Sequence, residues 1–268
     1  MAKPKDFGAR PNPKNGRYRL ISANWKMNLN HLEAISTAQK LFYLLREQDY
    51  HYTEISIHPP FTDLRSLQLL FESDRMPLSL GAQNCSDQPS GAYTGEISAA
   101  MLARLSVKFV IVGHSERREY FGESDQLVAA KVKAVLASQM IPLICVGETK
   151  EERDGASTDR VVSTSVDAVV RDRTSEEVSS FVFAYEPRWA IGTGRAATPE
   201  DAQHAAGVIR QAIARRHGET TANAVRVQYG GSVNAANAAS FMSCAELDGL
   251  LVGGASLDPD AFSRIIAA

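Results

Sequence analysis

The stretch that decides the fold is Phe181-Val182-Phe183-Ala184-Tyr185-Glu186-Pro187-Arg188-Trp189-Ala190-Ile191-Gly192-Thr193-Gly194. Its first five residues are apolar or β-prone and predict a buried parallel strand over 181–185. Glu186 follows at the carboxyl end of that strand, the edge at which parallel α/β sheets hold their ligands. Glu186 is therefore a candidate base. The alternative is an ion pair that caps the strand ahead of an ordinary loop.

The residues after Glu186 have the composition of a hinged loop. Pro187 and Trp189 stiffen the exit from the strand. Gly192 and Gly194 allow backbone conformations closed to other residues and offer bare N–H groups. We expect this segment to form a lid over an anion.

Seven further apolar runs accompany the strand at 181–185. The eight runs cover residues 18–23, 54–58, 78–82, 107–112, 141–146, 181–185, 225–229 and 249–252. Their starts lie roughly 23 to 45 residues apart, which leaves room for a crossover helix and is too long for hairpins. Capped amphipathic runs predict helices over 31–47 after Asn30, 126–138 after Ser124 and 199–216 after Thr198.

Eight βα units in about 250 residues predict an α/β fold, a closed (β/α)8 barrel of eight parallel strands each followed by a helix. A doubly wound open sheet is the alternative. That fold places its phosphate-binding glycines directly after the first strand, where residues 24–28 contain none. Glycines instead follow the seventh and eighth strands, at 230–231 and 253–254. Barrels commonly build a phosphate site there from backbone N–H groups.

Residues 1–17 differ from the rest of the chain, with five cations against Asp6 alone, three prolines and no hydrophobic periodicity. We expect a flexible basic extension over 1–17, followed by one barrel domain over 18–268. Removal of the extension should leave the function of the barrel intact. A basic arm that touches nucleic acid or a membrane surface is the weaker alternative.

The overall composition is that of an ordinary globular protein. The 268 residues are 44% hydrophobic and 22% charged, and the formal net charge of −2 gives no reason to expect a nucleic-acid partner. No apolar run has the length of a membrane span, and the first residues lack a secretory signal. The three cysteines have no disulfide or zinc-site spacing. We expect a cytoplasmic protein with reduced thiols and no membrane partner.

Closure of a barrel brings the polar residues at the strand ends together. His114 follows the fourth strand and opens a helix, whose positive end disfavours imidazolium, so the ring is expected to be neutral and to donate a hydrogen bond. Lys26 follows the first strand, and an electrostatic role is favoured over a Schiff base. Glu116 is either part of a surface ion-pair cluster or the group that holds Lys26. No second ligand stands at metal-binding spacing.

Together these residues suit proton transfer next to a carbonyl group. Glu186 would remove a carbon-bound proton, while His114 and Lys26 would stabilise the oxyanion of the resulting enediol. A lid is then required, because an enediol phosphate exposed to water can lose its phosphate.

The chain resembles the triosephosphate isomerase family from about residue 19 to its end. Six ordered motifs carry the resemblance: Asn24-Trp25-Lys26-Met27-Asn28, Gly91-Ala92-Tyr93-Thr94-Gly95-Glu96, Gly113-His114-Ser115-Glu116-Arg117-Arg118, Ala184-Tyr185-Glu186-Pro187-Arg188-Trp189-Ala190-Ile191-Gly192-Thr193-Gly194, Tyr229-Gly230-Gly231-Ser232 and Gly253-Gly254-Ala255-Ser256-Leu257.

The resemblance implies an aldose–ketose isomerase, an intramolecular oxidoreductase of glycolysis and gluconeogenesis that interconverts dihydroxyacetone phosphate and D-glyceraldehyde 3-phosphate. It implies a homodimer and no cofactor or metal. The catalytic residues would be Lys26, His114, Glu116 and Glu186. The substrate-binding residues would be Asn24, Lys26, Gly192, Ser232, Gly253 and Gly254. Met27 and Thr94 would lie in the dimer interface.

Two rival functions remain open, and the sequence departs from the family pattern at Arg188 and in the basic extension before Tyr18. A related isomerase of a four-carbon ketose phosphate would use the same site. A non-catalytic paralogue should have lost Lys26, His114 or Glu186, and all three are present. Arg188 stands in the lid hinge where the family usually has a smaller apolar residue, so we expect it to affect the opening and closing of the lid.

Overall fold

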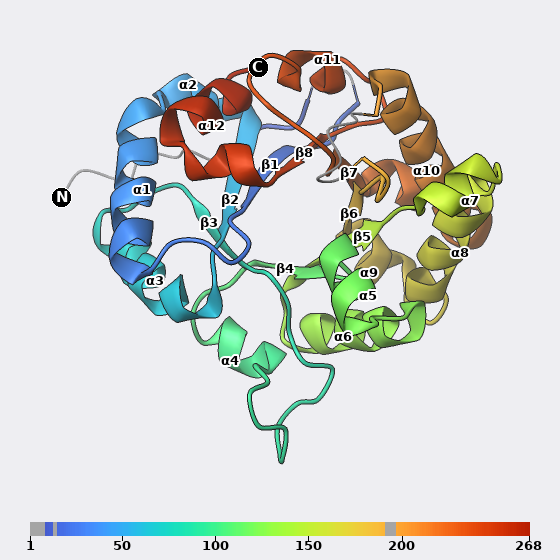
Figure 1. Ribbon diagram of the computed structural model, residues 1–268, viewed down its shortest axis with the longest axis horizontal. Coiled ribbons are helices and arrows are strands. Elements are labelled where there is room, and N and C mark those ends of the chain that lie inside the picture. Colours follow the sequence, from blue (N-terminus) through green and yellow to red (C-terminus); the bar gives the residue numbers. More distant parts are fainter. Residues whose placement is uncertain (1–8, 13–14, 191–196) are drawn as a thin grey trace.

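The computed structural model describes residues 9–12, 15–190 and 197–268. Its centre is a closed barrel of eight parallel strands in chain order, in which β1 pairs with both β2 and β8 (Figure 1). The strands are β1 (Arg19–Asn24), β2 (Thr53–His58), β3 (Ser79–Ala82), β4 (Phe109–Val112), β5 (Ile141–Val146), β6 (Val182–Tyr185), β7 (Arg226–Tyr229) and β8 (Gly249–Val252). The predicted barrel is confirmed, and the open sheet is wrong because β8 closes onto β1.

Helices surround the barrel and follow every strand (Figure 1). They are α1 (His31–Leu44), α2 (Glu47–Tyr52), α3 (Leu64–Ser73), α4 (Ala99–Ala103), α5 (Ser115–Phe121), α6 (Asp125–Ala137), α7 (Lys150–Asp154), α8 (Thr158–Val170), α9 (Ser175–Ser179), α10 (Pro199–Ala224), α11 (Ala238–Met242) and α12 (Pro259–Ile266), with 3-10 turns η1 (Phe61–Asp63) and η2 (Gly254–Leu257). Among the described helices, none is long and apolar enough to cross a membrane.

Two predicted helices differ from the observed ones. The helix expected over 31–47 is too long, because Leu45 is extended (φ −79°, ψ 138°) and separates α1 from α2. The helix expected over 199–216 is too short. Helix α10 continues to Ala224, although Gly218 interrupts it with a non-helical conformation (φ 82°, ψ 163°) that glycine adopts readily.

The inside of the barrel is apolar on one side. A cluster of eight buried apolar side chains fills it, drawn mainly from β4, β5 and β6: Leu20, Phe109, Ile111, Leu143, Cys145, Val182, Ala184 and Leu251. A second, larger cluster packs the outer faces of the strands against the helices. The strands are therefore fixed from both faces, which is the basis for a rigid site at their ends.

A buried chain of hydrogen bonds crosses the other side of the barrel interior. It links Gln228 Nε2 to Ser22 Oγ (2.9 Å), Ser22 Oγ to Ser56 Oγ (2.8 Å) and Ser56 Oγ to His58 Nε2 (3.0 Å). Burial lowers the pKa of His58 to about 4, so the ring is neutral near pH 7 and its Nδ1–H donates to the Ala82 carbonyl at 3.1 Å. These bonds connect β7, β1, β2 and β3.

The described part of the predicted extension contacts the barrel. The Arg10 backbone N–H donates to the His51 carbonyl at 2.7 Å. Arg17 is buried, and its Nε lies 2.5 Å from Asp248 Oδ1. The boundary between residues 17 and 18 stays a prediction, but Arg17 contributes an ion pair to the amino-terminal end of the barrel. Residues 1–8 and 13–14 of the predicted extension lie outside the described residues.

Candidate active site

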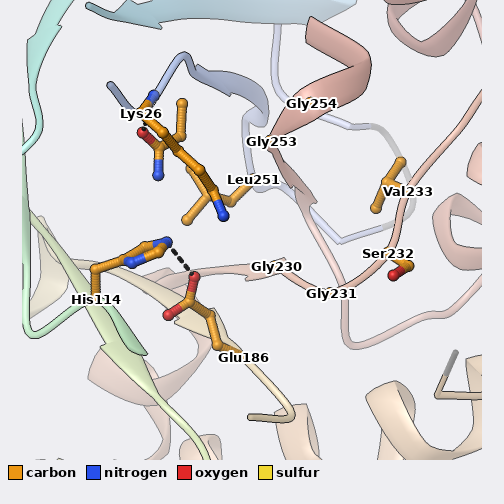
Figure 2. A pocket seen from close by; sticks show the side chains of 11 residues that line it. Lys26, His114, Glu186, Gly230, Gly231, Ser232, Val233, Leu251, Gly253 and Gly254 are labelled. Carbon is orange, nitrogen blue, oxygen red and sulfur yellow. Dashed lines mark hydrogen bonds and ion pairs between the residues drawn. The ribbon is translucent and has the colours of Figure 1, made fainter. Parts of the chain in front are cut away.

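The carboxyl ends of five strands surround a cavity of about 230 Å³ (Figure 2). Its lining comprises Asn24, Lys26, His114, Glu186, Gly230, Gly231, Ser232, Val233, Leu251, Gly253 and Gly254. The seven predicted site residues Asn24, Lys26, His114, Glu186, Ser232, Gly253 and Gly254 are thus brought together. Glu116 lies beside them, paired with Lys26. Gly192, predicted to bind substrate, lies outside the described residues, as does Gly194.

Glu186 is a buried carboxylate with hydrogen bonds to both oxygens. Oε2 accepts the backbone N–H of Ser115 at 2.8 Å, and Oε1 lies 3.0 Å from His114 Nε2. Burial opposes ionisation of the carboxyl group, but His114, the Ser115 N–H and Lys26 outweigh burial and hold the pKa of Glu186 below its ordinary value. The group is therefore ionised near neutral pH and able to accept a proton.

Two glycines that directly follow the neighbouring strands have no side chain, and Glu186 occupies the space that a side chain there would fill. A Cβ atom on Gly147, directly after β5, would lie 1.8 Å from the Glu186 carbonyl oxygen. A Cβ atom on Gly230, directly after β7, would lie 2.9 Å from Glu186 Cγ. Any side chain at Gly147 would therefore push the backbone of Glu186 away from its place, and a side chain at Gly230 would crowd the carboxylate.

His114 is the N-cap of α5 and is 6% exposed. Its Nδ1 accepts the Glu116 backbone N–H at 3.3 Å, which requires Nδ1 to be unprotonated and places the proton of a neutral ring on Nε2. Burial lowers the pKa of His114, whereas the Glu186 carboxylate raises it more, and the result lies above the ordinary value. Burial and Glu186 thus shift the pKa of His114 in opposite directions, and the neutral ring, which the acceptor role of Nδ1 favours, stays a prediction.

Lys26 lies in the loop after β1 and reaches across the mouth of the barrel. Its Nζ lies 2.5 Å from Glu116 Oε1, and its Cε would lie 3.4 Å from a Cβ atom on Gly253. The Asn24 side chain accepts the Lys26 backbone N–H at 3.1 Å. Figure 2 shows the lysine side chain extended toward His114 and Glu186. The ammonium group therefore lies between the carboxylate side and the glycine side of the cavity.

The glycine side of the cavity can hold an anion. Gly253 and Gly254 line it where β8 passes into η2, and Ser232 lines it after β7. Glycine backbone has no Cβ to keep a ligand away from its N–H groups, and the ammonium group of Lys26 adds a positive charge next to them. The arrangement suits a phosphate group at one end of a small molecule.

Two lining residues were missed by reasoning from the sequence. Leu251 is an apolar wall of the cavity, and the period-two alternation of β8, which puts residues 249, 251 and 253 on one face, would have identified it. Val233 directly follows the predicted site residue Ser232, and nothing in the sequence marks Val233 itself as a site residue. The direction of the Ser115 N–H, which donates to Glu186, is set by the turn between β4 and α5, and the sequence does not specify the geometry of that turn.

Metal binding has no support in the described part of the chain. No group of three or more His, Cys, Asp or Glu side chains there is placed to hold a metal ion. The chemistry that the described residues can provide is proton transfer and electrostatic stabilisation.

A closed parallel barrel with an ionised carboxylate, an imidazole, an ammonium group and a glycine cradle around one cavity defines a (β/α)8-barrel enzyme for a small anionic substrate. The family model described as triosephosphate isomerase matches residues 19–268. A triosephosphate isomerase of Streptomyces avermitilis is 48% identical over 249 residues, which cover 93% of this chain and 96% of the relative. That of Corynebacterium efficiens is 48% identical over 252 residues, 94% and 96% of the two chains. That of Mycobacterium avium is 47% identical over 251 residues, again 94% and 96%. The chain belongs to the triosephosphate isomerase family and is an isomerase.

Proposed function

We propose that this chain interconverts dihydroxyacetone phosphate and D-glyceraldehyde 3-phosphate through an enediolate. One observation carries the proposal: an ionised Glu186 and His114 Nε2 lie 3.0 Å apart on one side of a small cavity whose other side is the cradle of Ser232, Gly253 and Gly254. A molecule with a carbonyl group near one end and a phosphate at the other fits this cavity, with the carbonyl group beside Glu186 and His114 and the phosphate in the glycine cradle. The relatives named triosephosphate isomerase support the same reaction.

The proton transfer follows from the two bonds that Glu186 makes. A substrate carbonyl oxygen that accepts the Nε2–H of His114 would release Glu186 Oε1, while the Ser115 N–H keeps Oε2 in place at 2.8 Å. The released oxygen then takes a proton from the hydroxyl-bearing carbon next to the carbonyl group and returns it to the former carbonyl carbon, while the hydroxyl proton passes to the former carbonyl oxygen. One carboxylate thus serves both directions of the reaction, and the substrate gains and loses no atoms.

Lys26 and His114 stabilise the charge that develops on the substrate oxygens. Both lie on the same cavity as Glu186, and the ion pair with Glu116 keeps the Lys26 ammonium group in place at 2.5 Å. Donors that are already oriented before the reaction stabilise an oxyanion without reorganisation, which is usually a large part of the rate enhancement. Glu116 acts here by holding Lys26.

An assay of the purified protein on triose and tetrulose phosphates tests the function. We expect the triose phosphates to be interconverted and the four-carbon ketose phosphate to be a poor substrate, since the family members matched here are named for the triose. Faster turnover of the tetrulose phosphate would establish the four-carbon alternative. Absence of turnover on both, with a folded protein, would establish the non-catalytic alternative.

We also propose a homodimer. Residues 83–98 project away from the barrel as a long loop between β3 and α4 (Figure 1), and this loop carries Thr94 and a half-exposed Tyr93. Met27, beside Lys26, is 95% exposed. A second copy whose loop covers Met27 would remove these apolar side chains from water.

Sedimentation equilibrium tests the dimer. Thr94→Arg should shift the protein toward monomers and lower its activity, because the loop that carries Lys26 loses its cover. Thr220→Arg, the same substitution on an exposed position of α10, is the matched control and should leave a dimer. A parent protein that sediments as a monomer and is fully active would contradict the proposal.

We infer a cytoplasmic location and a reaction without cofactor or metal. The three cysteines, all among the described residues, are unpaired, which fits a reducing compartment. Activity that survives dialysis against a chelator would support a metal-free reaction. Activity restored only by an added metal ion would refute it.

A further inference from the structure

A second hollow lies on the outside of the barrel, between α8 and α10, which pack side by side (Figure 1). This α8–α10 groove has a volume of about 720 Å³. It is lined by Ser163, Thr164, Asp167, Arg171, Ala212, Arg215 and Arg216. None of these residues lines the cavity that contains Glu186. The isomerase reaction therefore gives the groove no role.

The lining of the α8–α10 groove is positively charged. Three arginines against one aspartate leave it with a net charge of +2, although the whole chain has a net charge of −2. Charges of one sign that line a concave surface raise the local concentration of oppositely charged ligands. The groove therefore attracts anions, and the overall composition of the chain does not explain its charge.

Asp167 holds two of the three arginines in place. Its Oδ1 accepts hydrogen bonds from Arg216 Nε at 2.9 Å and Nη2 at 2.7 Å, and its Oδ2 accepts one from Arg171 Nη2 at 2.7 Å. The hydrogen bonds from Arg171 and Arg216 hold the pKa of Asp167 below its ordinary value, so the carboxylate is ionised near neutral pH. A guanidinium group has five N–H donors, and most of them stay available to a ligand.

The third arginine has no carboxylate of its own. Arg215 is exposed and forms no ion pair with another described residue, so its guanidinium group is fully available. Ala212 is buried between the helices and lies one turn before Arg215 and Arg216 on α10. Its small side chain leaves the space between the arginines open. The exposed Thr164 adds a hydroxyl group from α8.

We propose that the α8–α10 groove binds an oligophosphate group, a chain of linked phosphates as carried by a nucleoside triphosphate or by inorganic polyphosphate. The planar guanidinium fork matches two oxygens of a phosphate, and an ammonium group offers no such match. The arginines come from two helices and line an elongated opening between them. A chain of phosphates can therefore contact more of these arginines than a single phosphate can, and it carries the two or more negative charges that the groove requires.

Calorimetric titration of the purified protein with tripolyphosphate tests the proposal. The parent should show saturable binding, and the double variant Arg171→Gln, Arg215→Gln should bind at least about tenfold more weakly, the effect of about one lost hydrogen bond between charged groups. Both arginines are exposed, so the variant should fold. Arg264→Gln, on an exposed position of α12, is the matched control and should bind like the parent.

Binding at the active site must be measured separately, because its glycine cradle also suits a phosphate. Inhibition of the isomerase by tripolyphosphate reports that site, and its inhibition constant should stay within about twofold of the parental value in the double variant, since neither arginine lines the cavity. Titration with ATP distinguishes the two sources of the ligand: tighter binding than tripolyphosphate identifies a nucleotide, and equal binding identifies the phosphate chain alone.

Three results would overturn the inference: parental affinity in the double variant, an equal loss of affinity in Arg264→Gln, or binding of orthophosphate as tight as that of tripolyphosphate. None of them bears on the proposed isomerase activity, which belongs to the other site.

Discussion

The two ends of the barrel carry the same kinds of charged group in opposite arrangements. At the amino-terminal end, Glu54 accepts hydrogen bonds from Lys108, from Arg226 at 2.8 Å and from Ser79 at 3.1 Å, so the carboxylate is surrounded by its partners. At the carboxyl end, Glu186 faces a cavity instead. Paired charges stabilise a fold, whereas charges that converge on open space can act on a ligand.

A second cluster strengthens the contrast. Asp248 lies at the amino-terminal end of β8 and receives Arg17 at 2.5 Å, Arg210 at 2.8 Å and the Val227 N–H at 2.9 Å. Arg17 and Arg210 are both buried. Removal of one partner from such a cluster leaves a buried charge uncompensated, which is costly for folding and irrelevant to a reaction at the other end of the barrel.

Lys26→Met is expected to have a large effect on activity. The substitution keeps the length of the side chain and removes the charge next to the developing oxyanion, so kcat/KM should fall by about 10²- to 10³-fold. Lys108→Met makes the same change at the opposite end, where the ammonium group pairs with Glu54, and should keep kcat within about twofold. Equal losses of activity in the two variants would show that charges at the two ends of the barrel do not differ in their effect on the reaction.

Stability should depend on Arg226 in a pH-dependent way. Burial opposes the charge of Glu54, but Arg226 and Lys108 outweigh it, so the pKa of Glu54 is lower in the folded protein than its ordinary 4.5. A carboxyl group with a lowered pKa stabilises the fold above its unfolded pKa and loses this effect as the pH falls through its folded pKa.

Arg226→Met should therefore lower the free energy of unfolding by about 1–3 kcal/mol at neutral pH, with a smaller loss below about pH 4. Urea unfolding at both pH values measures the difference. Arg264→Met, on an exposed position of α12, is the matched control and should have little effect at either pH. A loss that is independent of pH would show that Arg226 acts by packing over Phe109 and not through Glu54.

The ion pair of Arg17 predicts that the amino-terminal extension contributes to stability but not to activity. Arg17→Met should lower the free energy of unfolding by about 1–2 kcal/mol, because Asp248 keeps only one of its two arginines, and kcat should not change. A protein that begins at residue 18 should show the same stability loss and retain activity. Loss of activity or of the dimer on truncation would give the extension a role beyond this ion pair.

The smallest effect is expected from Arg188→Val. The Arg188 backbone N–H donates to the Glu148 carbonyl at 3.1 Å, and Arg188 Nε is buried without a hydrogen-bond partner in the described part of the chain. Valine removes this buried polar atom, so turnover and hydrogen exchange in residues 189–197 should change, by less than about tenfold. Parental turnover together with parental exchange would show that Arg188 does not affect the lid hinge.

Much of the site could be predicted because barrel closure leaves few choices. Polar residues that directly follow buried parallel strands must meet at one end, so Lys26, His114 and Glu186 could be grouped from their positions alone. The ionised state of Glu186 could not, since it depends on how His114 and the Ser115 N–H are directed at the carboxylate, which the turn between β4 and α5 sets.

The ties between distant segments were not predictable from the sequence. Gln83 reaches Lys26 across 57 positions of the chain, and Arg17 reaches Asp248 across 231. Long flexible side chains leave no periodic signal, and their partners are decided only when the barrel closes. The break between α1 and α2 was missed for a local reason, because the amphipathic pattern continues through the extended Leu45.

The most direct test of the difference between the two ends is to make the same substitution, carboxylate to amide, at Glu186 and at Glu54 and to measure kcat and the free energy of unfolding for both. Glu186→Gln should lower kcat by about 10²- to 10⁴-fold, the usual worth of a general base, with little loss of stability. Glu54→Gln should keep kcat within about twofold and lose about 1–3 kcal/mol of stability. A Glu186→Gln protein within about tenfold of the parental rate would contradict the account.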